Sequence, residues 1–206
     1  MLTIAVAKGY LMAEAMAKFH SIGVEFQDDL RESRKLFTYD STGLIRLLQV
    51  RPWDVPVYVA QGAADLGISG FDVLEEKKDD VIRLINLDFG ACRLVIAGAN
   101  DRPFDSLFHD IRVATKYPNA TEAYFQRLGV KARIIKLYGA IELAPVTGLS
   151  DVIVDLTATG KTLEENHLSI IDTIFSSTAQ LITNSSSFCL KDRAIRNLTQ
   201  KLNALP

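Results

Sequence analysis

The chain has 206 residues, of which 48% are hydrophobic and 23% charged, and its formal net charge is −2. This length suits one large domain or two small ones, with enough apolar residues to bury a substantial core. The balanced charge argues against a nucleic-acid-binding surface, and no apolar run reaches the roughly 18 residues that a membrane span needs.

The first half of the chain alternates between predicted strands and helices. Residues 2–7 form an apolar strand with no basic segment before it, so we expect no signal peptide. A helix follows over residues 11–20, where Leu11, Ala15 and Phe19 recur at helical spacing. Strands are then predicted over residues 36–39, 44–50, 62–70, 81–87 and 92–97, and short helices over residues 54–61 and 71–77.

The second half continues this alternation. Strands are predicted over residues 111–114, 132–137, 152–156, 170–175 and 180–183. Helices are predicted over residues 118–128 and 141–144, after residue 162, and over residues 191–202. Alternating strands and helices indicate parallel sheets covered by helices. We expect two α/β lobes with a cleft between them, and a single doubly wound domain is the alternative.

Cysteine and histidine give no sign of a metal site. Cys92 and Cys189 lack metal-ligand spacing and do not suggest a disulfide framework. His20, His109 and His167 are dispersed along the chain. We therefore expect no dedicated metal site, and a reducing cytoplasmic compartment.

The most informative segment runs from Val152 to Thr162. An apolar strand brings Asp155 to its carboxyl end, where open α/β sheets bind ligands, and a loop rich in threonine and glycine precedes a helix. Backbone N–H groups at a helix start and threonine hydroxyls suit a phosphate, and Gly160 permits close approach of the backbone. Asp155 cannot favour a phosphate directly, but it can accept hydrogen bonds from sugar hydroxyls. The segment therefore predicts a site for a ribose 5-phosphate group.

Two other interpretations of this segment are open. It can be a buried strand, a polar turn and a capped helix with no ligand. It also imitates a Walker A loop at Gly160-Lys161-Thr162, but Asp155 stands where that motif needs a further glycine. The Walker A match fails at the residue on which the tight turn depends.

The segment Glu142–Leu163 is similar to the signature of ATP phosphoribosyltransferases, which has a Glu, a Gly and a small residue, an apolar strand with Asp, and a Thr/Ser-Gly-x-Thr-Leu loop. The resemblance extends over essentially the whole chain. It includes residues 51–56, 62–68, 92–94 and 114–119.

This resemblance implies a fold and an organisation. It implies two α/β lobes similar to the type II periplasmic binding protein fold. We expect residues 1–89 and 183–206 to form the first lobe and residues 90–182 the second. Long-form members carry a C-terminal domain that binds histidine. This chain ends soon after its last predicted helix, so it resembles the short form.

The resemblance also implies a reaction and partners. N1 of the ATP adenine attacks C1 of 5-phosphoribosyl 1-pyrophosphate and displaces pyrophosphate with inversion, at the first step of histidine biosynthesis. Mg²⁺ would accompany the pyrophosphate and ATP. Short forms need a separate regulatory subunit related to histidyl-tRNA synthetase, and we also expect a homodimer of catalytic chains.

Roles for individual residues follow from the motif and the resemblance. We assign Asp155 to the ribose hydroxyls and the loop to the 5-phosphate, and Arg51 and Arg34 are the catalytic candidates for the ATP polyphosphate or the departing pyrophosphate. The family commonly has Lys-Gly-Arg after the first strand, where this chain has Tyr10 in place of the Arg. The loop residues are Thr157, Ala158, Thr159, Gly160, Lys161 and Thr162, and the candidates for ATP are Lys8, Gly9, Tyr10, Asp72 and Arg93.

Two rival functions are considered. A non-catalytic solute-binding protein of the periplasmic type is suggested by the segment 62–68 between two α/β lobes, but it explains neither the loop nor the expected lack of a signal peptide. A structural subunit that has lost activity is favoured slightly by Tyr10 and opposed by the intact signature.

Overall fold

The computed structural model describes residues 1–32, 34–99 and 110–204, and these fall into two compact units. The first unit contains Met1–Gly90 and Thr178–Pro206, and the second contains Ala91–Ser177. Two α/β units confirm the predicted fold class over a single doubly wound domain. Each unit is described by itself.

The first unit carries a six-stranded sheet in the order β2-β3-β1-β4-β11-β5. Strands β3, β1 and β4 run parallel, whereas β2 and β11 run antiparallel to their neighbours. Its strands are β1 (Leu2–Ala7), β2 (Phe37–Tyr39), β3 (Ile45–Val50), β4 (Leu66–Gly70), β5 (Ile82–Asn86) and β11 (Ala179–Thr183). Its helices are α1 (Tyr10–Ser21), the 3-10 turn η1 (Pro52–Asp54), α2 (Val55–Ala60), α3 (Phe71–Lys77), α7 (Ser185–Leu190) and α8 (Asp192–Asn203).

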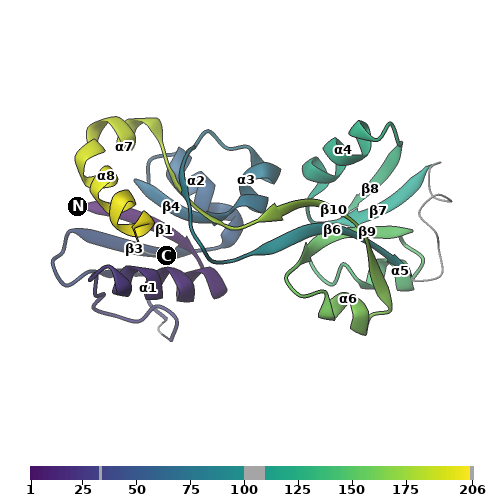
Figure 1. Cartoon of the computed structure of the whole chain (residues 1–206), viewed down its shortest axis with the longest axis horizontal. Helices are drawn as coiled ribbons and strands as arrows, with labels where there is room; N and C mark the ends of the chain where they lie inside the picture. The colour runs from purple at the N-terminus through teal and green to yellow at the C-terminus, as the bar shows by residue number, and fades with distance from the viewer. Residues whose placement is uncertain (33, 100–109, 205–206) are drawn as a thin grey trace. The chain divides into compact units, whose positions relative to one another are not determined.

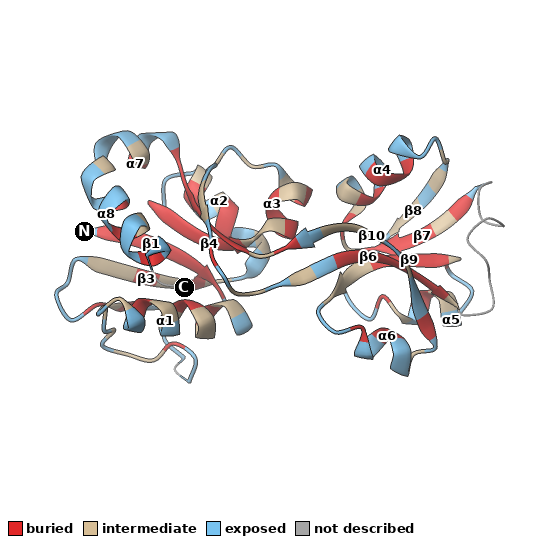
Figure 2. Cartoon of the chain, viewed as in Figure 1, coloured by how far each residue is buried: buried red, intermediate tan, exposed pale blue. Residues whose placement is uncertain are grey.

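Helices cover both faces of this sheet. Apolar residues of α1 and α8, such as Phe19 and Leu198, pack with one face, and residues of α2 and α3, such as Val59 and Leu74, pack with the other. Strand β1 is buried along its whole length and β4 along most of it, as Figure 2 shows. Central strands buried on both faces explain why residues 2–7 read as an uninterrupted apolar run.

The second unit carries a five-stranded sheet in the order β10-β6-β9-β7-β8. Its strands are β6 (Cys92–Ala99), β7 (Ile111–Thr115), β8 (Ala132–Lys136), β9 (Val152–Thr157) and β10 (Leu168–Ser177). Its helices are α4 (Pro118–Arg127), α5 (Leu143–Val146) and α6 (Lys161–Glu165). Figure 1 shows α4 against one side of this sheet and α5 and α6 against the other. Ile153 of β9 packs on the second side with Ala144 and Leu163.

The sequence indicated parallel sheets, but both sheets are mixed and contain antiparallel neighbours as well. Strand β6 runs antiparallel to β9, and β10 runs antiparallel to β6. No helix separates β5 from β6 or β10 from β11 in chain order. These two direct connections lead from one sheet to the other, so β6 and β10 are strands that join the two units rather than parts of a strand–helix–strand repeat.

The predicted lobe boundary near residue 182 is also wrong. Strand β11 was expected in the second lobe, but it pairs with β4 and β5 of the first sheet. The chain therefore returns to the first unit at Thr178, and the other boundary lies after Gly90. None of the helices in the described part of the chain combines the length and the hydropathy that a membrane span requires.

Candidate functional site

The junction between β9 and α6 carries the predicted phosphate loop. Asp155 is half-buried in the last part of β9, and the loop residues Ala158 and Thr159 are exposed. Gly160 precedes α6 with a φ of 86°, in the left-handed region that glycine adopts without strain. A Cβ at this position would contact nothing closer than the Ile170 Cδ1 at 3.9 Å, so backbone conformation rather than space explains the glycine.

Threonine hydroxyls set the shape of this loop. The Gly160 N–H donates a 2.8 Å hydrogen bond to Thr157 Oγ1, and the Lys161 N–H donates a longer one of 3.4 Å to Thr159 Oγ1. Each threonine can still donate its own hydroxyl proton to a ligand. The side chains of Lys161 and Thr162 are exposed at the start of α6. Because α6 has five residues, the loop's own N–H and hydroxyl donors matter more for an anion than the helix dipole.

Asp155 lies in an environment that disfavours its charge. Burial raises the pKa of the Asp155 carboxyl, and the nearby Glu142 carboxylate raises it further. The Leu156 N–H, which donates a 2.8 Å hydrogen bond to Asp155 Oδ1, and the Lys116 ammonium act in the opposite direction. The net pKa lies above the usual range of an aspartate. A ligand that donates hydrogen bonds to this carboxylate would relieve part of the cost of its burial.

A buried hydroxyl holds the neighbouring strand against β9. Thr115 is fully buried at the end of β7, and its Oγ1 donates a 2.7 Å hydrogen bond to the Val154 carbonyl. The same oxygen accepts a 2.9 Å hydrogen bond from the Tyr117 N–H, just before α4. Thr115 thus ties the end of β7 and the start of α4 to the residue before Asp155.

Arg93 lies on the strand next to the loop 157–162. It is exposed on β6, and its backbone pairs directly opposite Thr157. Opposite residues of an antiparallel pair project from the same face, so Arg93 shares a face with Thr157 and Asp155. The structure therefore brings this arginine, predicted for ATP, together with the predicted phosphate loop.

Lys8 and Arg51 meet at the carboxyl edge of the first sheet. They follow Ala7 and Val50, which pair at the ends of β1 and β3, and the Lys8 N–H donates a 2.8 Å hydrogen bond to the Val50 carbonyl. The side chains of both cations are exposed. Gly9, with a φ of 98°, then turns the chain into α1.

Tyr10 and Arg34 extend the same region. Tyr10 is the first residue of α1 and is exposed. The Gln49 N–H donates to the Leu36 carbonyl, which continues the β2–β3 pairing beyond Phe37. Arg34 lies in an exposed loop three residues before β2 begins. Because β2 and β3 are antiparallel, this loop is at the edge of the sheet where Arg51 follows β3.

Asp72, one of the candidates for ATP, is buried at the start of α3. It is 6% exposed in the first turn of α3, and its Oδ1 would lie 2.2 Å from a Cβ built on Gly70. The carboxylate thus folds back on its own turn instead of pointing outward. The assignment of Asp72 to ATP stays a prediction.

The predicted site residues thus fall into two groups. Asp155, the loop 157–162 and Arg93 lie together in the second unit, and Lys8, Gly9, Tyr10, Arg51 and Arg34 lie along one edge of the first sheet. Two further residues near Asp155, Lys116 and Glu142, were given no substrate role from the sequence, although the sequence held signals for both. Lys116 directly follows a strand parallel to β9, and Glu142 opens the signature segment.

The described residues offer limited ligation for a metal ion. They contain no group of three or more His, Cys, Asp or Glu side chains placed to hold one. Asp155 and Glu142 are two neighbouring carboxylates, which suits a Mg²⁺ ion held mainly by substrate phosphates and water.

Comparison with known proteins supports this interpretation. The family model described as ATP phosphoribosyltransferase matches residues 51–204. The chain is 45% identical to an ATP phosphoribosyltransferase of Caldanaerobacter subterraneus subsp. tengcongensis over 201 residues, covering 97% of this chain and 95% of the relative.

Solved structures give the same result. The ATP phosphoribosyl transferase (HisG:HisZ) complex from Thermotoga maritima contains a similar chain, with a TM-score of 0.84 and 38% identity over 99% of this chain and 98% of that one. The alkanesulfonate-binding protein SsuA from Xanthomonas axonopodis pv. citri has a TM-score of 0.62 and 13% identity, covering 98% of this chain and 72% of that one. The second likeness concerns the fold alone, and it agrees with the predicted type II binding fold.

Proposed function

The chain belongs to the ATP phosphoribosyltransferase family, and on that basis we propose that it transfers the phosphoribosyl group of 5-phosphoribosyl 1-pyrophosphate to N1 of ATP. The products are N1-(5-phosphoribosyl)-ATP and pyrophosphate, and the reaction is the first step of histidine biosynthesis. The observation that carries this proposal within the structure is the β9–α6 junction, where a half-buried carboxylate adjoins a hydroxyl-rich loop.

The second unit holds the sugar donor in this proposal. The loop 157–162 binds the 5-phosphate through threonine hydroxyls and backbone N–H groups. Asp155 accepts hydrogen bonds from the ribose hydroxyls, which compensate the carboxylate for its burial. Arg93, on the same face as Thr157, adds a positive charge beside the anionic donor.

The exposed cations of the first unit bind the polyphosphate of ATP or the departing pyrophosphate. Arg51 and Arg34 are suited to bidentate contacts with phosphate, and Lys8 supplies a compact positive charge beside Arg51. N1 of adenine has a free lone pair, so the attack on C1 needs no general base. Positioning of two bound reactants can supply up to roughly 7–11 kcal/mol. Stabilisation of charge on the leaving group supplies a further part.

Mg²⁺ is proposed to arrive with the pyrophosphate and ATP rather than in a site of the protein. When bound, it would neutralise charge on the phosphate oxygens. Asp155 and Glu142, which interact electrostatically beside the proposed donor site, would contribute at most one or two ligands.

We further propose that the chain is the short form and binds a separate regulatory subunit related to histidyl-tRNA synthetase. The support is the similarity to the Thermotoga maritima protein, which was solved as a HisG:HisZ complex. The alignment covers 99% of this chain and 98% of that one, so neither has a large additional domain relative to the other. A homodimer of catalytic chains belongs to the same proposal. A cytoplasmic location fits the two free cysteines, Cys92 and Cys189.

A direct assay tests the proposed reaction. The chain, alone and with its regulatory subunit, is incubated with ATP, 5-phosphoribosyl 1-pyrophosphate and Mg²⁺, and a new ultraviolet-absorbing N1-ribosylated nucleotide is followed with pyrophosphate release. We expect both products in equal amounts. Binding of the sugar donor without any turnover, under either condition, would favour the non-catalytic alternatives.

A further inference from the structure

A cavity of about 530 Å³ opens in the first unit, at the end of the sheet opposite to Lys8 and Arg51. Its lining includes Leu2 at the start of β1, whereas Lys8 follows the end of that strand. A strand of this length spans about 20 Å. The cavity is therefore separate from the residues proposed to bind phosphate.

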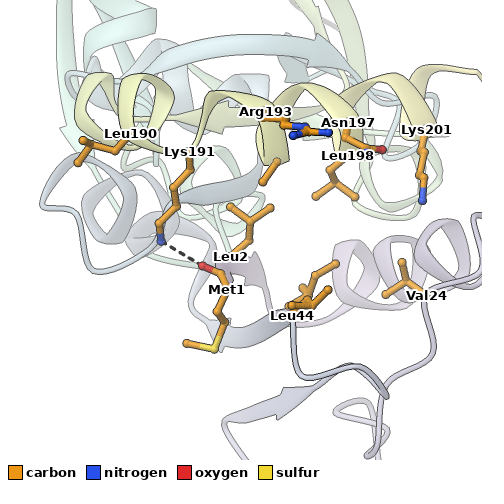
Figure 3. A pocket seen from close by; sticks show the side chains of 12 residues that line it. Met1, Leu2, Val24, Leu44, Leu190, Lys191, Arg193, Asn197, Leu198 and Lys201 are labelled. Atoms are coloured by element: carbon orange, nitrogen blue, oxygen red, sulfur yellow. Dashed lines mark hydrogen bonds between the residues drawn. The ribbon is translucent and has the colours of Figure 1, made fainter.

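The interior of the cavity is apolar and its margin exposes large apolar side chains. Leu2, Val24 and Leu198 line it, and Figure 3 shows Leu44 and the α8 residue Leu198 on facing sides. Leu44 is 63% exposed and Leu190, at the end of α7, is 85% exposed. Large apolar side chains that cluster around an opening mark binding surfaces more often than isolated ones do.

The charged side chains that line the cavity are all cationic. Lys191, Arg193 and Lys201 line it, and no acidic residue is among the lining. Lys191 is bound to Asp65 Oδ2 at 2.7 Å and to the Met1 carbonyl at 3.1 Å. Arg193 and Lys201 are exposed, and within the described part of the chain neither has an ion pair. Two positive charges thus remain available beside an apolar opening.

We propose that this cavity is the docking site for the regulatory subunit, which inserts an apolar side chain flanked by carboxylates. The identity of the partner rests on the proposed function. The apolar side chain fills the space between Leu2, Leu44 and Leu198, and the carboxylates pair with Arg193 and Lys201.

Charge disfavours a second copy of this chain as the occupant. In a two-fold symmetric dimer the same patch meets itself, so Arg193 and Lys201 would face further cations with no acid in the lining to offset them. An acidic partner removes that conflict, and the related Thermotoga maritima protein is found in a complex with a second protein.

The test measures binding of the purified regulatory subunit by calorimetry and sedimentation velocity, independently of catalysis. We expect the double variant Arg193→Glu/Lys201→Glu, and separately Leu190→Asp, to weaken binding at least tenfold. The double variant should also lose most of the salt dependence of the affinity. Matched controls are Lys131→Glu, for an exposed cation, and Leu143→Asp, for an exposed apolar residue, both in the second unit. They should bind as the unmodified chain does.

Basal phosphoribosyl transfer should be unchanged in all four variants, because none of these residues is proposed to touch substrate. Unchanged binding of the subunit by the cavity variants would overturn the proposal. So would their loss of self-association, since it would assign the surface to a second copy of the chain. If the unmodified chain showed no transfer, the proposed function would fail. The docking proposal would still be decided by whether the cavity variants weaken binding of the subunit.

Discussion

The Thr115 hydroxyl donates a 2.7 Å hydrogen bond to the carbonyl of Val154, the residue directly before Asp155. Backbone pairing between β7 and β9 ends at this same pair of residues. The hydroxyl also accepts from the Tyr117 N–H, so it fixes the point at which β7 leaves the sheet for α4. Thr115 therefore links the part of β9 just before Asp155 to the turn that carries Lys116.

Replacement of Thr115 should therefore reduce catalysis without contact with substrate. We expect Thr115→Val to remove the hydrogen bonds that Thr115 Oγ1 makes with the Val154 carbonyl and the Tyr117 N–H, at a cost of about 1–3 kcal/mol in stability. The KM for 5-phosphoribosyl 1-pyrophosphate should rise roughly tenfold, equivalent to about 1.4 kcal/mol. Steady-state kinetics and urea unfolding measure the two effects.

Thr115→Ser is the matched control because it retains the hydroxyl. It should restore most of the KM while it loses one buried methyl group. Equal KM values for the Val and Ser variants would show that the hydrogen bond has no part in positioning Asp155.

Asp155→Asn should separate stability from function. Burial and Glu142 raise the pKa of Asp155 in the folded protein, so folding favours its protonated form. The unmodified chain should lose stability as pH rises from the unfolded pKa, near 3.8, through the raised folded pKa. The Asn variant should lack this loss and be more stable at neutral pH, yet bind the sugar donor at least tenfold more weakly. Unfolding at several pH values and direct binding of the sugar donor measure the two effects. If the Asn variant were less stable than the unmodified chain at neutral pH, the assigned direction of the Asp155 pKa would be refuted.

The sequence predicted the β9–α6 junction well because its signal is local. An apolar strand, an acid, a glycine and three threonines stand within one short segment, and the turn depends on residues three or fewer positions apart, as in the bond between Thr157 and Gly160. Helix α7 was not predicted, although Asn184 caps it by accepting a 2.8 Å hydrogen bond from the Ser187 N–H. Its short polar sequence resembles a loop in composition.

Features that depend on contacts between residues far apart in the sequence could not be predicted from short sequence segments. Strand β11 was placed in the wrong lobe because nothing in its own sequence reveals that it pairs with β4, more than a hundred residues earlier. The grouping of Glu142 and Lys116 around Asp155, and of Arg93 opposite Thr157, likewise depends on strand order.

Arg51→Ala should lower turnover with little effect on folding. Arg51 is exposed beside Lys8 and forms no ion pair within the described residues. We expect kcat to fall at least tenfold, because a phosphate contact is lost, and the free energy of unfolding to change by less than about 0.5 kcal/mol. Arg133→Ala, an exposed arginine on β8, is the control and should retain normal turnover. Normal turnover in Arg51→Ala would exclude Arg51 from catalysis.

Asp65 should stabilise the first unit at the end of the sheet opposite to Arg51. Its buried carboxylate accepts hydrogen bonds from the Thr3 N–H, the Ser187 hydroxyl and the Lys191 ammonium. Burial alone would raise the Asp65 pKa, but these bonds outweigh it and lower the pKa below the usual value. The stabilisation is therefore present at neutral pH and is lost as pH falls below 3.8 through the folded pKa.

We expect Asp65→Asn to lower the free energy of unfolding by about 2 kcal/mol at neutral pH. The difference from the unmodified chain should shrink under acidic conditions, where Asp65 itself becomes protonated. Urea unfolding across this pH range measures it, and a difference that does not depend on pH would contradict a role for the ionised carboxylate.

The most direct measurement is a crystal structure of the chain with bound 5-phosphoribosyl 1-pyrophosphate. We expect the 5-phosphate within hydrogen-bonding distance of Thr157, Thr159 and Thr162, and the ribose hydroxyls on the Asp155 carboxylate. A donor bound with its phosphate at any other place, and Asp155 without contact to the sugar, would contradict the proposed site.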